Sequence, residues 1–507
     1  MDTIIRINNA VNGFAWGTFG LVLLLGTGAL CTVITGFFQF THIRYWISKT
    51  FGSIKGEARI VNDAGALSQY RTFCTALCAT VGTGNIVGVA SAVCVGGAGA
   101  VFWMWVAALL GMMVKYSENV LGIYYRRRNV EGAWSGGPMY YLQDGVGSLK
   151  HCKKFGRVLG VIFCVLTMVA SFGIGNMIQI NKITVNVEET FFAGVDKGTL
   201  FGFSRVNLTI GVVLMIAAAM IIFGGFRRVA AASEKLIPFM SILYIAGCLI
   251  VVAIHITKLP DVFLSIFKFA LGSSALKGGA AGTAVQVAVN TIKSGCKRGI
   301  FSNEAGLGSS VIVHCNTCAR EPVKQGLWGM AEVFLDTIVI CTMTALVVLS
   351  SDLVDLKTGM VLDGTSDATL VARAFGDSLG RPGEWFVVFA ITLFAFSTFI
   401  GWSYYGAKVT EYLLGVRVAR FYRVLFVAII IWGSVTESSL AWEISDTFNG
   451  LMMIPNLIGV IALSPLIIRL TRNYTDRRIK GKDIEPMLSY DPDIQRDANK
   501  AVQKGAY

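Results

Sequence analysis

A short glycine-rich motif lies in the middle of an apolar segment that is long enough to cross a membrane. It consists of Val81, Gly82, Thr83, Gly84 and Asn85. An unwound stretch inside a bilayer is tolerated only where protein or a water-filled cavity satisfies its backbone. The two half-helices then offer free N–H groups to a carboxylate and free carbonyls to a cation. Close helix packing would also use Gly-Thr-Gly, but the polar Asn85 favours a binding site.

Two further apolar segments carry polar side chains at membrane depth. In SFGIGNMIQIN, Asn176 and Gln179 share one helical face, and amides can bind amino or carboxyl groups without burying a charge. In FAFSTFIGWSYYG, the hydroxyls of Ser397 and Thr398 suit a small monovalent cation, and Trp402 can wall a small apolar side chain. Each pattern has an ordinary alternative. For Asn176 and Gln179 it is interhelical hydrogen bonding, and for Ser397 and Thr398 it is hydrogen bonding to carbonyls of their own helix. For Trp402 it is packing or anchoring at the membrane interface.

A second glycine interruption, Gly278–Gly282, follows five core spans after the first. Two such interruptions are typical of transporters built from inverted repeats. Glycine spacing selects Gly279 and Gly282 as members of a second broken helix. Asp336 lies deep in another apolar segment. An intramembrane carboxylate is a functional candidate by default, and a structural partner for it is an equal alternative.

The residue pattern does not favour an enzyme, an ATP-driven pump or a channel. The four His are scattered, and the HCNTC stretch at His314–Cys318 lacks a second pair of zinc ligands. The sequence contains no G-x-x-x-x-G-K-[ST] phosphate loop. No filter-like repeat indicates a channel built by subunit symmetry. A carrier without enzymatic activity remains.

Composition indicates an all-α protein that crosses a membrane many times. The 507 residues are 54% hydrophobic and 15% charged, whereas soluble domains carry about 25% charged residues. The net charge of +13 does not indicate a nucleic-acid partner, because the basic residues separate apolar runs. Apolar runs of about twenty residues can cross a bilayer. We predict eleven transmembrane helices: 13–36, 70–92, 100–124, 157–180, 206–226, 236–257, one interrupted within 262–298, 326–350, 385–407, 421–436 and 446–468.

The distribution of Lys and Arg predicts the orientation. Successive loops alternate between many and few basic residues, as expected when cytoplasmic loops are the basic ones. We therefore expect the N-terminus outside and the C-terminus in the cytoplasm. The polar tail beyond Arg469 is expected to be partly disordered. The N-terminus has no pattern of a removed signal peptide.

The stretch KRGIFSNEAGLGSS, Lys297 to Ser310, resembles a signature of the alanine or glycine:cation symporter family. CATVGTGNI, GGPMYYL, GNMIQ, EVFLDT, FSTFIGWSYYG and NGLMMIPNL resemble family segments in the same order, so the resemblance covers about residues 15–470. The family belongs to amino acid transporters with the bacterial leucine-transporter fold. The resemblance implies a 5+5 inverted-repeat core, with discontinuous first and sixth core helices. The expected units are an extra N-terminal helix in 1–40, repeats in 70–257 and 262–468, and a cytoplasmic tail in 469–507.

The resemblance also implies the ligands and their contacts. The expected function is symport of sodium with alanine or glycine across the inner (plasma) membrane by alternating access, through a monomer. A proton-coupled carrier of small neutral amino acids is the alternative. The preferred amino acid, its isomer and the role of Asp336 stay open. Expected substrate contacts are Thr83, Gly84, Asn85, Gln179, Gly279, Gly282 and Trp402. Expected sodium ligands are the carbonyl of Val81 and the hydroxyls of Ser397 and Thr398.

Overall fold

The computed structural model describes most of the chain. The described residues are 2–56, 59, 63, 65–192, 198–200, 202–271, 281–362, 367–436 and 439–503. Within them the protein is almost entirely helical, as expected. The few strands form three short antiparallel hairpins: β1 (Arg127–Arg128) with β2 (Trp134–Ser135), β3 (Thr199–Leu200) with β4 (Phe203–Ser204), and β5 (Val354–Asp355) with β6 (Met360–Val361).

In the described ranges, nine helices are long and apolar enough to cross a membrane, and one bent pair makes a tenth. The first combines α1 (Asp2–Ala15) and α2 (Thr18–Ile34). The uninterrupted ones are α7 (Gly99–Tyr125), α11 (Arg205–Ile222), α12 (Gly225–Ile254), α20 (Arg381–Leu414), α21 (Val416–Val435) and α22 (Ser439–Ala462). Two contain a wide π-type turn: α9 (Lys153–Phe172), η6 (Gly173–Met177) and α10 (Ile178–Phe191); and α17 (Pro322–Val333), η8 (Phe334–Cys341) and α18 (Thr342–Ser350). The bent pair is α5 (Gln69–Thr80) with η3 (Gly84–Gly88) and α6 (Val89–Gly96).

Ten of the eleven predicted spans have a counterpart among these helices. The remaining one, expected within 262–298, falls on two helices, α13 (Leu259–Leu271) and α15 (Ala281–Asn303). Among the described residues, neither helix qualifies as a span by length and hydropathy. The all-α membrane architecture is confirmed, whereas the count of eleven and the repeat arrangement stay predictions.

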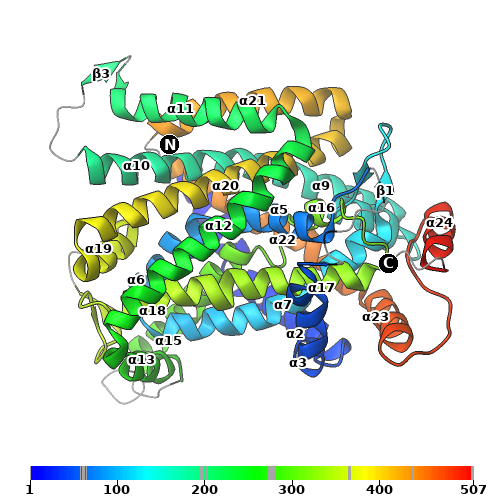
Figure 1. The fold of residues 1–507 in the computed structure, drawn as a ribbon, viewed down its shortest axis with the longest axis horizontal. Helices are drawn as coiled ribbons and strands as arrows, with labels where there is room; N and C mark the ends of the chain where they lie inside the picture. Colours follow the sequence, from blue (N-terminus) through cyan, green and yellow to red (C-terminus); the bar gives the residue numbers. More distant parts are fainter. Residues whose placement is uncertain are drawn as a thin grey trace.

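Shorter elements lie between the long helices or follow the last of them. They are α3 (Phe38–Thr41), α4 (Ile43–Lys49), η1 (Phe51–Ser53), α8 (Pro138–Tyr140), η4 (Tyr141–Gly145), η5 (Val146–Ser148), η7 (Ile256–Lys258), α16 (Val311–His314), α19 (Asp367–Leu379), α23 (Ser464–Arg478) and α24 (Pro492–Gln503). Figure 1 shows the β3 hairpin, α13 and α19 at one end of the molecule, and β1, α23 and α24 at the other.

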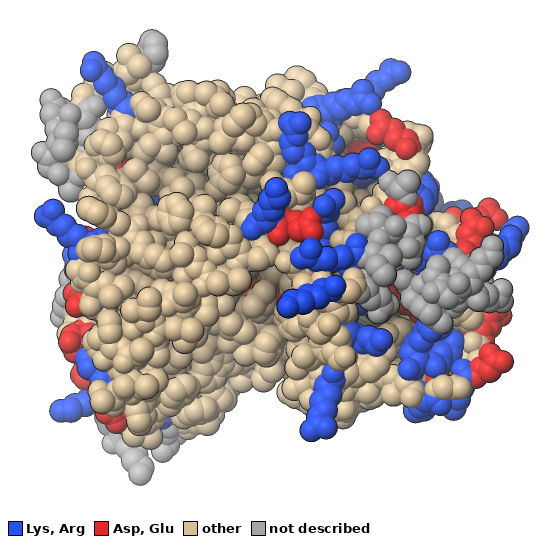
Figure 2. All heavy atoms as spheres, viewed as in Figure 1, with Lys and Arg blue, Asp and Glu red and all other residues tan. Residues whose placement is uncertain are grey.

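The outer faces of several long helices are apolar. Large hydrophobic side chains are exposed on α9, α11, α12 and α21, for example Ile162, Val213, Ile242 and Phe421. In water such a surface would associate, but against lipid tails it is the stable arrangement. Figure 2 shows that Lys and Arg gather mainly at the end that carries β1, α23 and α24. The molecule therefore has an apolar middle and one strongly basic end.

The C-terminal segment packs onto the basic end. Arg477 and Arg478 of α23 both pair with Glu321, at 2.7 and 2.9 Å, and the Tyr490 N–H donates to the carbonyl of Tyr124 at 2.9 Å. The expectation of a partly disordered tail is wrong for residues 469–503, because their charges find specific partners. α23 also crosses the predicted boundary at residue 469.

Candidate functional site

The first interrupted helix bends by 57° between α5 and the η3–α6 segment. Val81 leaves the helical conformation, with φ −75° and ψ 98°. A side chain on Gly82 would place its Cβ 2.2 Å from Oγ1 of Thr398, so only glycine fits there. The Gly82 N–H donates instead to Oδ1 of Asn85 at 2.8 Å. The motif therefore breaks the helix because glycine allows α20 to approach and asparagine caps the freed backbone.

The three predicted sodium ligands meet at this break. The hydroxyls of Ser397 and Thr398 each lie 3.3 Å from the carbonyl oxygen of Val81. Both hydroxyls also donate to the Phe394 carbonyl of their own helix, at 2.8 and 3.0 Å. All these groups are buried. The arrangement gathers carbonyl and hydroxyl oxygens from two helices around one point, and it carries no fixed charge.

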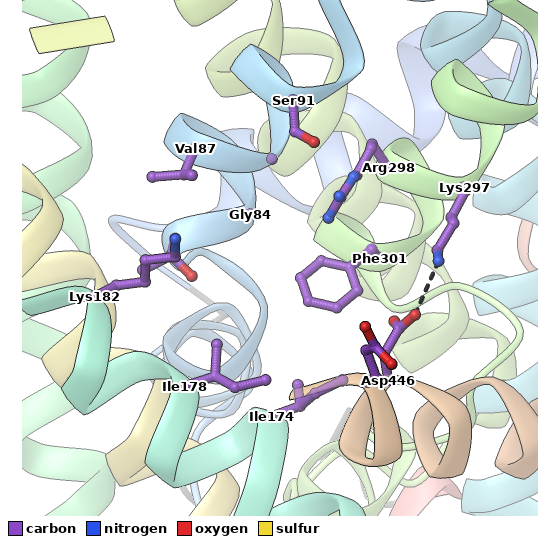
Figure 3. A pocket seen from close by; sticks show the side chains of 13 residues that line it. Gly84, Val87, Ser91, Ile174, Ile178, Lys182, Lys297, Arg298, Phe301 and Asp446 are labelled. Carbon is purple, nitrogen blue, oxygen red and sulfur yellow. Dashed lines mark hydrogen bonds and ion pairs between the residues drawn. The ribbon is translucent and has the colours of Figure 1, made fainter. Parts of the chain in front are cut away.

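A pocket of about 330 Å³ opens beside the same break (Figure 3). The first broken helix, the α9–α10 segment, α15 and α22 supply its walls. The lining residues are Thr83, Gly84, Val87, Gly88, Ser91, Ile174, Ile178, Lys182, Lys297, Arg298, Phe301, Glu443 and Asp446. Thr83 and Gly84 stand at the start of the second half-helix, where the first N–H groups have no partner within the helix. The half-helix dipole makes that end attractive to a carboxylate.

Charged side chains surround the pocket. Lys297 pairs with Asp446 at 2.8 Å, and this carboxylate also accepts from Asn12 of α1 at 3.0 Å. Figure 3 shows the Arg298 side chain directed into the pocket. Within the described part of the chain, Arg298 has no ion-pair partner. A guanidinium in this position favours entry of a group that carries negative charge.

Two other predicted substrate contacts lie just behind the pocket wall. Gln179 Oε1 accepts from the Thr83 hydroxyl at 3.0 Å, and the Gln179 amide donates to the carbonyl of Ile174 at 3.1 Å. Trp402 is buried, and a Cβ on Gly175 would lie 2.6 Å from it. Neither Gln179 nor Trp402 is among the lining residues in this conformation. Gln179 and Trp402 pack behind the residues that line the pocket, and the wide turn at η6 brings them close to those residues.

Asn85 points away from the pocket and into the protein. Its amide nitrogen donates to the Asp336 carboxylate at 2.7 Å and to the Asp336 carbonyl at 3.1 Å. Ser302 and Thr337 donate to the same carboxylate at 2.9 and 2.8 Å. The Asp336 carboxylate therefore fixes the Asn85 side chain, whose oxygen in turn accepts a hydrogen bond from the backbone of the break. In this structure Asn85 contacts Asp336 and the backbone of the break, and its direct contact with substrate stays a prediction.

Among the described residues, a second interruption follows α15. α15 runs unbroken from Ala281 to Asn303, and the chain becomes irregular only over Glu304–Ser310. Glu304, Gly306 and Gly308 have positive φ angles of 54°, 85° and 76°. Gly282 lies in the first turn of α15, and Gly279 is outside the described residues. The interruption predicted at Gly278–Gly282 lies mostly outside the described residues and stays a prediction.

Polar side chains satisfy this second break. Asn456 donates to the Gly306 carbonyl at 2.8 Å and to the Glu118 carboxylate at 2.5 Å. The Lys115 ammonium donates to Ser310 at 2.8 Å and lies 3.5 Å from the Glu332 carboxylate. The Ser309 hydroxyl donates to the Glu304 carboxylate. Lys115, Glu118, Glu304 and Glu332 are all buried.

Two other sequence interpretations resolve as structural. The amide of Asn176 donates to the carbonyl of Phe426 at 2.7 Å, which is the interhelical bond that was its ordinary alternative. His314 is buried between Glu332 and Gln325, at 2.7 and 2.6 Å. Among the described residues, no group of three or more His, Cys, Asp or Glu could hold a metal ion.

Sequence reasoning missed several pocket residues. Arg298 and Phe301 lie inside the KRGIF stretch, which was read only as a family signature. The available signal was a pair of basic residues inside an otherwise apolar helix, because such charges face a water-filled cavity. Ile174 and Ile178 carried no signal, since apolar residues in a span are ordinary.

Comparisons with known proteins identify relatives of the chain. A family model described as the sodium:alanine symporter family matches residues 1–487. A sodium/alanine symporter, AgcS, from Methanococcus maripaludis is 40% identical over 94% of this chain and 98% of its own. A probable sodium/glutamine symporter, GlnT, from Bacillus subtilis is 34% identical over 94% of this chain and 92% of its own.

A solved structure is similar in fold. The crystal structure of MhsT in complex with L-phenylalanine aligns with a TM-score of 0.51 and 15% identity. The alignment covers 88% of this chain and 100% of that chain. At this identity the likeness shows the fold alone, which is the expected leucine-transporter fold.

Proposed function

The chain belongs to the sodium:alanine symporter family, and from that premise we propose that it couples sodium entry to uptake of alanine or glycine. It is a multi-pass membrane protein and a sodium-coupled amino acid symporter. The proposal adds the identity of the amino acid, the residues that hold each ligand and the direction of transport. The observation that carries it is the meeting of Val81, Ser397 and Thr398 beside the Thr83–Gly84 wall of the pocket.

Sodium binds, in this proposal, between α5 and α20. The Val81 carbonyl and the two hydroxyls supply oxygen ligands that need no proton to be removed. Sodium replaces the hydrogen bonds that the hydroxyls now share with Val81 and Phe394. Because the ligands come from two helices, bound sodium holds the break against α20. It thereby fixes the half-helix that presents the substrate wall.

The amino acid binds with its carboxylate at the Thr83 and Gly84 N–H groups. Helix N-termini suit carboxylates, and Gln179 holds the Thr83 hydroxyl in place at 3.0 Å. The ammonium group faces the hydroxyl and carbonyl oxygens of the same break. Since carboxylate and sodium attach to neighbouring turns of one broken helix, each ligand orders the backbone that the other needs. The two affinities must rise by the same factor.

Selection of a small side chain happens when the pocket closes. A volume of about 330 Å³ lies in the range that accepts drug-sized ligands, so alanine does not fill the open pocket. Phe301 lies against Gly84, with a ring atom 3.4 Å from where a Cβ would be. Movement of α15 and of the Trp402 wall toward Gly84 would leave space for a methyl group only. The glutamine named for GlnT marks side-chain size as the property to test.

The proposed orientation places the basic end in the cytoplasm. Cytoplasmic loops are the basic ones in most membrane proteins, and Figure 2 locates the basic end. α1 contacts the pocket rim through Asn12 and Asp446, and Figure 1 marks the N-terminus away from α23 and α24. The pocket then opens to the outside, and the second break lies on the closed inner side. The protein would work in the plasma membrane.

Uptake of labelled alanine into proteoliposomes tests the function. An inward sodium gradient should drive accumulation, and a proton gradient without sodium should not. Accumulation driven equally by protons alone would overturn the sodium assignment. Unlabelled glycine should compete, whereas glutamine should compete at least about tenfold more weakly. Stronger competition by glutamine than by alanine would overturn the small-substrate proposal and leave the symport itself intact.

A further inference from the structure

The N-terminal span precedes the two predicted repeats, and its first half reaches the rim of the substrate pocket. Asn12 lies in α1, and Trp16 follows one helical turn later, with its backbone N–H donating to the Asn12 carbonyl at 2.8 Å. Trp16 is buried and Asn12 is half-buried. Neither is among the residues that line the pocket, so any effect on the substrate must pass through other side chains.

Both residues hold Asp446, a residue of α22 that lines the pocket. The Asn12 amide donates to the Asp446 carboxylate at 3.0 Å, and the Trp16 indole donates to the Asp446 carbonyl at 2.9 Å. The Asn12 amide also donates to the Thr447 hydroxyl at 3.0 Å. The side chain and the backbone of Asp446 are therefore fixed from the same turn of the N-terminal span.

Asp446 in turn holds the face of α15 that borders the pocket. The oxygen that accepts from Asn12, Oδ2, also pairs with the Lys297 ammonium at 2.8 Å. This ammonium lies 5.4 Å from the centre of the Trp16 ring, a distance at which a cation is attracted to an aromatic face. Lys297 and Phe301 are four residues apart on an unbroken helix and share one face. Figure 3 shows the Lys297–Asp446 pair beside the Phe301 ring.

The N-terminal span is itself packed tightly against its neighbours. A Cβ on Gly28 of α2 would lie 2.8 Å from the Leu110 side chain of α7. A Cβ on Gly450 of α22 would lie 2.6 Å from the Trp16 indole. Such close approaches leave no space for a sideways shift, so the span is a fixed support for Asp446.

We propose that Asn12 and Trp16 are positioning residues for substrate selection. Through Asp446 and Lys297 they set where the Phe301 turn of α15 stands, and hence how closely its ring meets the first broken helix. The inference rests on the proposed function, in which closure of α15 over the first break limits the size of the side chain. Loss of either donor loosens the Phe301 turn, so alanine binds more weakly and larger amino acids are rejected less.

Uptake kinetics of the full-length protein in proteoliposomes test the proposal. Trp16→Phe removes the indole N–H and keeps an aromatic ring. In this variant and in Asn12→Ala, KM for alanine should rise about fivefold, while kcat changes less than about twofold. Glutamine should compete better, relative to unlabelled alanine, than it does in the wild type. The matched control is Asn9→Ala, the same substitution at an exposed position of α1.

A double-mutant cycle separates positioning from a general loss of stability. Lys297→Gln alone should raise KM about fivefold. Adding Asn12→Ala to it should change KM less than about twofold further, because both substitutions act through the same pair. Independent effects would multiply instead, to roughly twenty-fivefold.

Two results would overturn the positioning role. One is a KM and a competition pattern in Asn12→Ala and Trp16→Phe that match those of Asn9→Ala. The other is full multiplication of the effects of Asn12→Ala and Lys297→Gln. The wild type tests the proposed function separately, because it either accumulates alanine or does not. If it accumulates glutamine instead, the cycle is measured with labelled glutamine and the KM values decide in the same way.

Discussion

The interruption at Val81–Thr83 is neutral and borders an open pocket, whereas the one at Glu304–Ser310 is enclosed by charged side chains. At the first break, the hydroxyls of Ser397 and Thr398 each lie 3.3 Å from the carbonyl oxygen of Val81. In the second, the Gly306 carbonyl is taken by Asn456 at 2.8 Å and Ser310 by Lys115 at 2.8 Å. Both breaks have partners for backbone groups that would otherwise be unsatisfied in a membrane. Of the two, only the first leaves oxygen atoms and N–H groups for a ligand.

This difference assigns different tasks to the two breaks. Uncharged oxygens can exchange a hydrogen bond for sodium with little change in solvation. A buried charge network has no such freedom, because removal of one partner leaves another charge unpaired. The first break is therefore suited to binding and release, and the second to a closed state with a definite structure. Changes at the first should alter sodium affinity, and changes at the second should alter stability.

The largest effect on transport is expected from Gly82→Ala. The new Cβ would lie 2.2 Å from Oγ1 of Thr398, so it pushes that hydroxyl away from Val81. Overpacking costs about 1–3 kcal/mol, and its upper end corresponds to roughly a hundredfold loss of sodium-dependent uptake. Gly26→Ala is the control, since nothing lies within 4 Å of that Cβ. If Gly82→Ala showed wild-type sodium-dependent uptake, the Thr398 hydroxyl would not be a sodium ligand.

Asn456→Ala is expected to act on stability. It removes the partner of the Gly306 carbonyl and of the Glu118 carboxylate, and an unsatisfied buried group costs about 1–3 kcal/mol. The melting temperature in detergent should fall, while the sodium concentration for half-maximal uptake changes less than about twofold. A large shift in sodium dependence with unchanged melting would reverse the assignment of the two breaks.

Arg298→Gln should have the smallest effect. A partly exposed charge contributes about 1 kcal/mol or less, so KM for alanine should rise no more than about fivefold, and less at high salt. Arg420→Gln is the matched control, because this arginine is 70% exposed and pairs with Glu131. An unchanged KM at low salt would show that Arg298 does not attract the substrate.

The sequence analysis predicted the first break and did not predict the one at Glu304–Ser310, and the reason is physical. At Val81–Asn85, glycine and a capping asparagine occur together, so the break and its satisfaction are both visible. Glycine spacing alone selected Gly278–Gly282, a stretch without a polar side chain. In SNEAGLGSS, the Asn303 side-chain oxygen accepts from the Ala305 N–H at 2.9 Å, and the distant Asn456 donates to the Gly306 carbonyl at 2.8 Å. A polar segment between apolar halves was therefore the better signal.

Individual contacts were harder to predict than helices. Asn85 looked like a ligand group, but its partner Asp336 is distant in the sequence, and only packing shows that the two meet at 2.7 Å. Trp402 and Gln179 lie close behind the wall because of the wide turn at η6, which hydropathy does not reveal. Membrane spans follow from local composition, whereas a site depends on which faces of distant helices meet.

Thermodynamic coupling between the two ligands tests the central claim most directly. Alanine binding to purified protein, measured by calorimetry with and without saturating sodium, gives the factor by which sodium raises alanine affinity. In Ser397→Ala/Thr398→Ala this factor should fall by at least about tenfold, and in Asn456→Ala it should stay within about twofold of wild type. Wild-type coupling in the double variant would contradict the account, because sodium would then act from a site other than the first break.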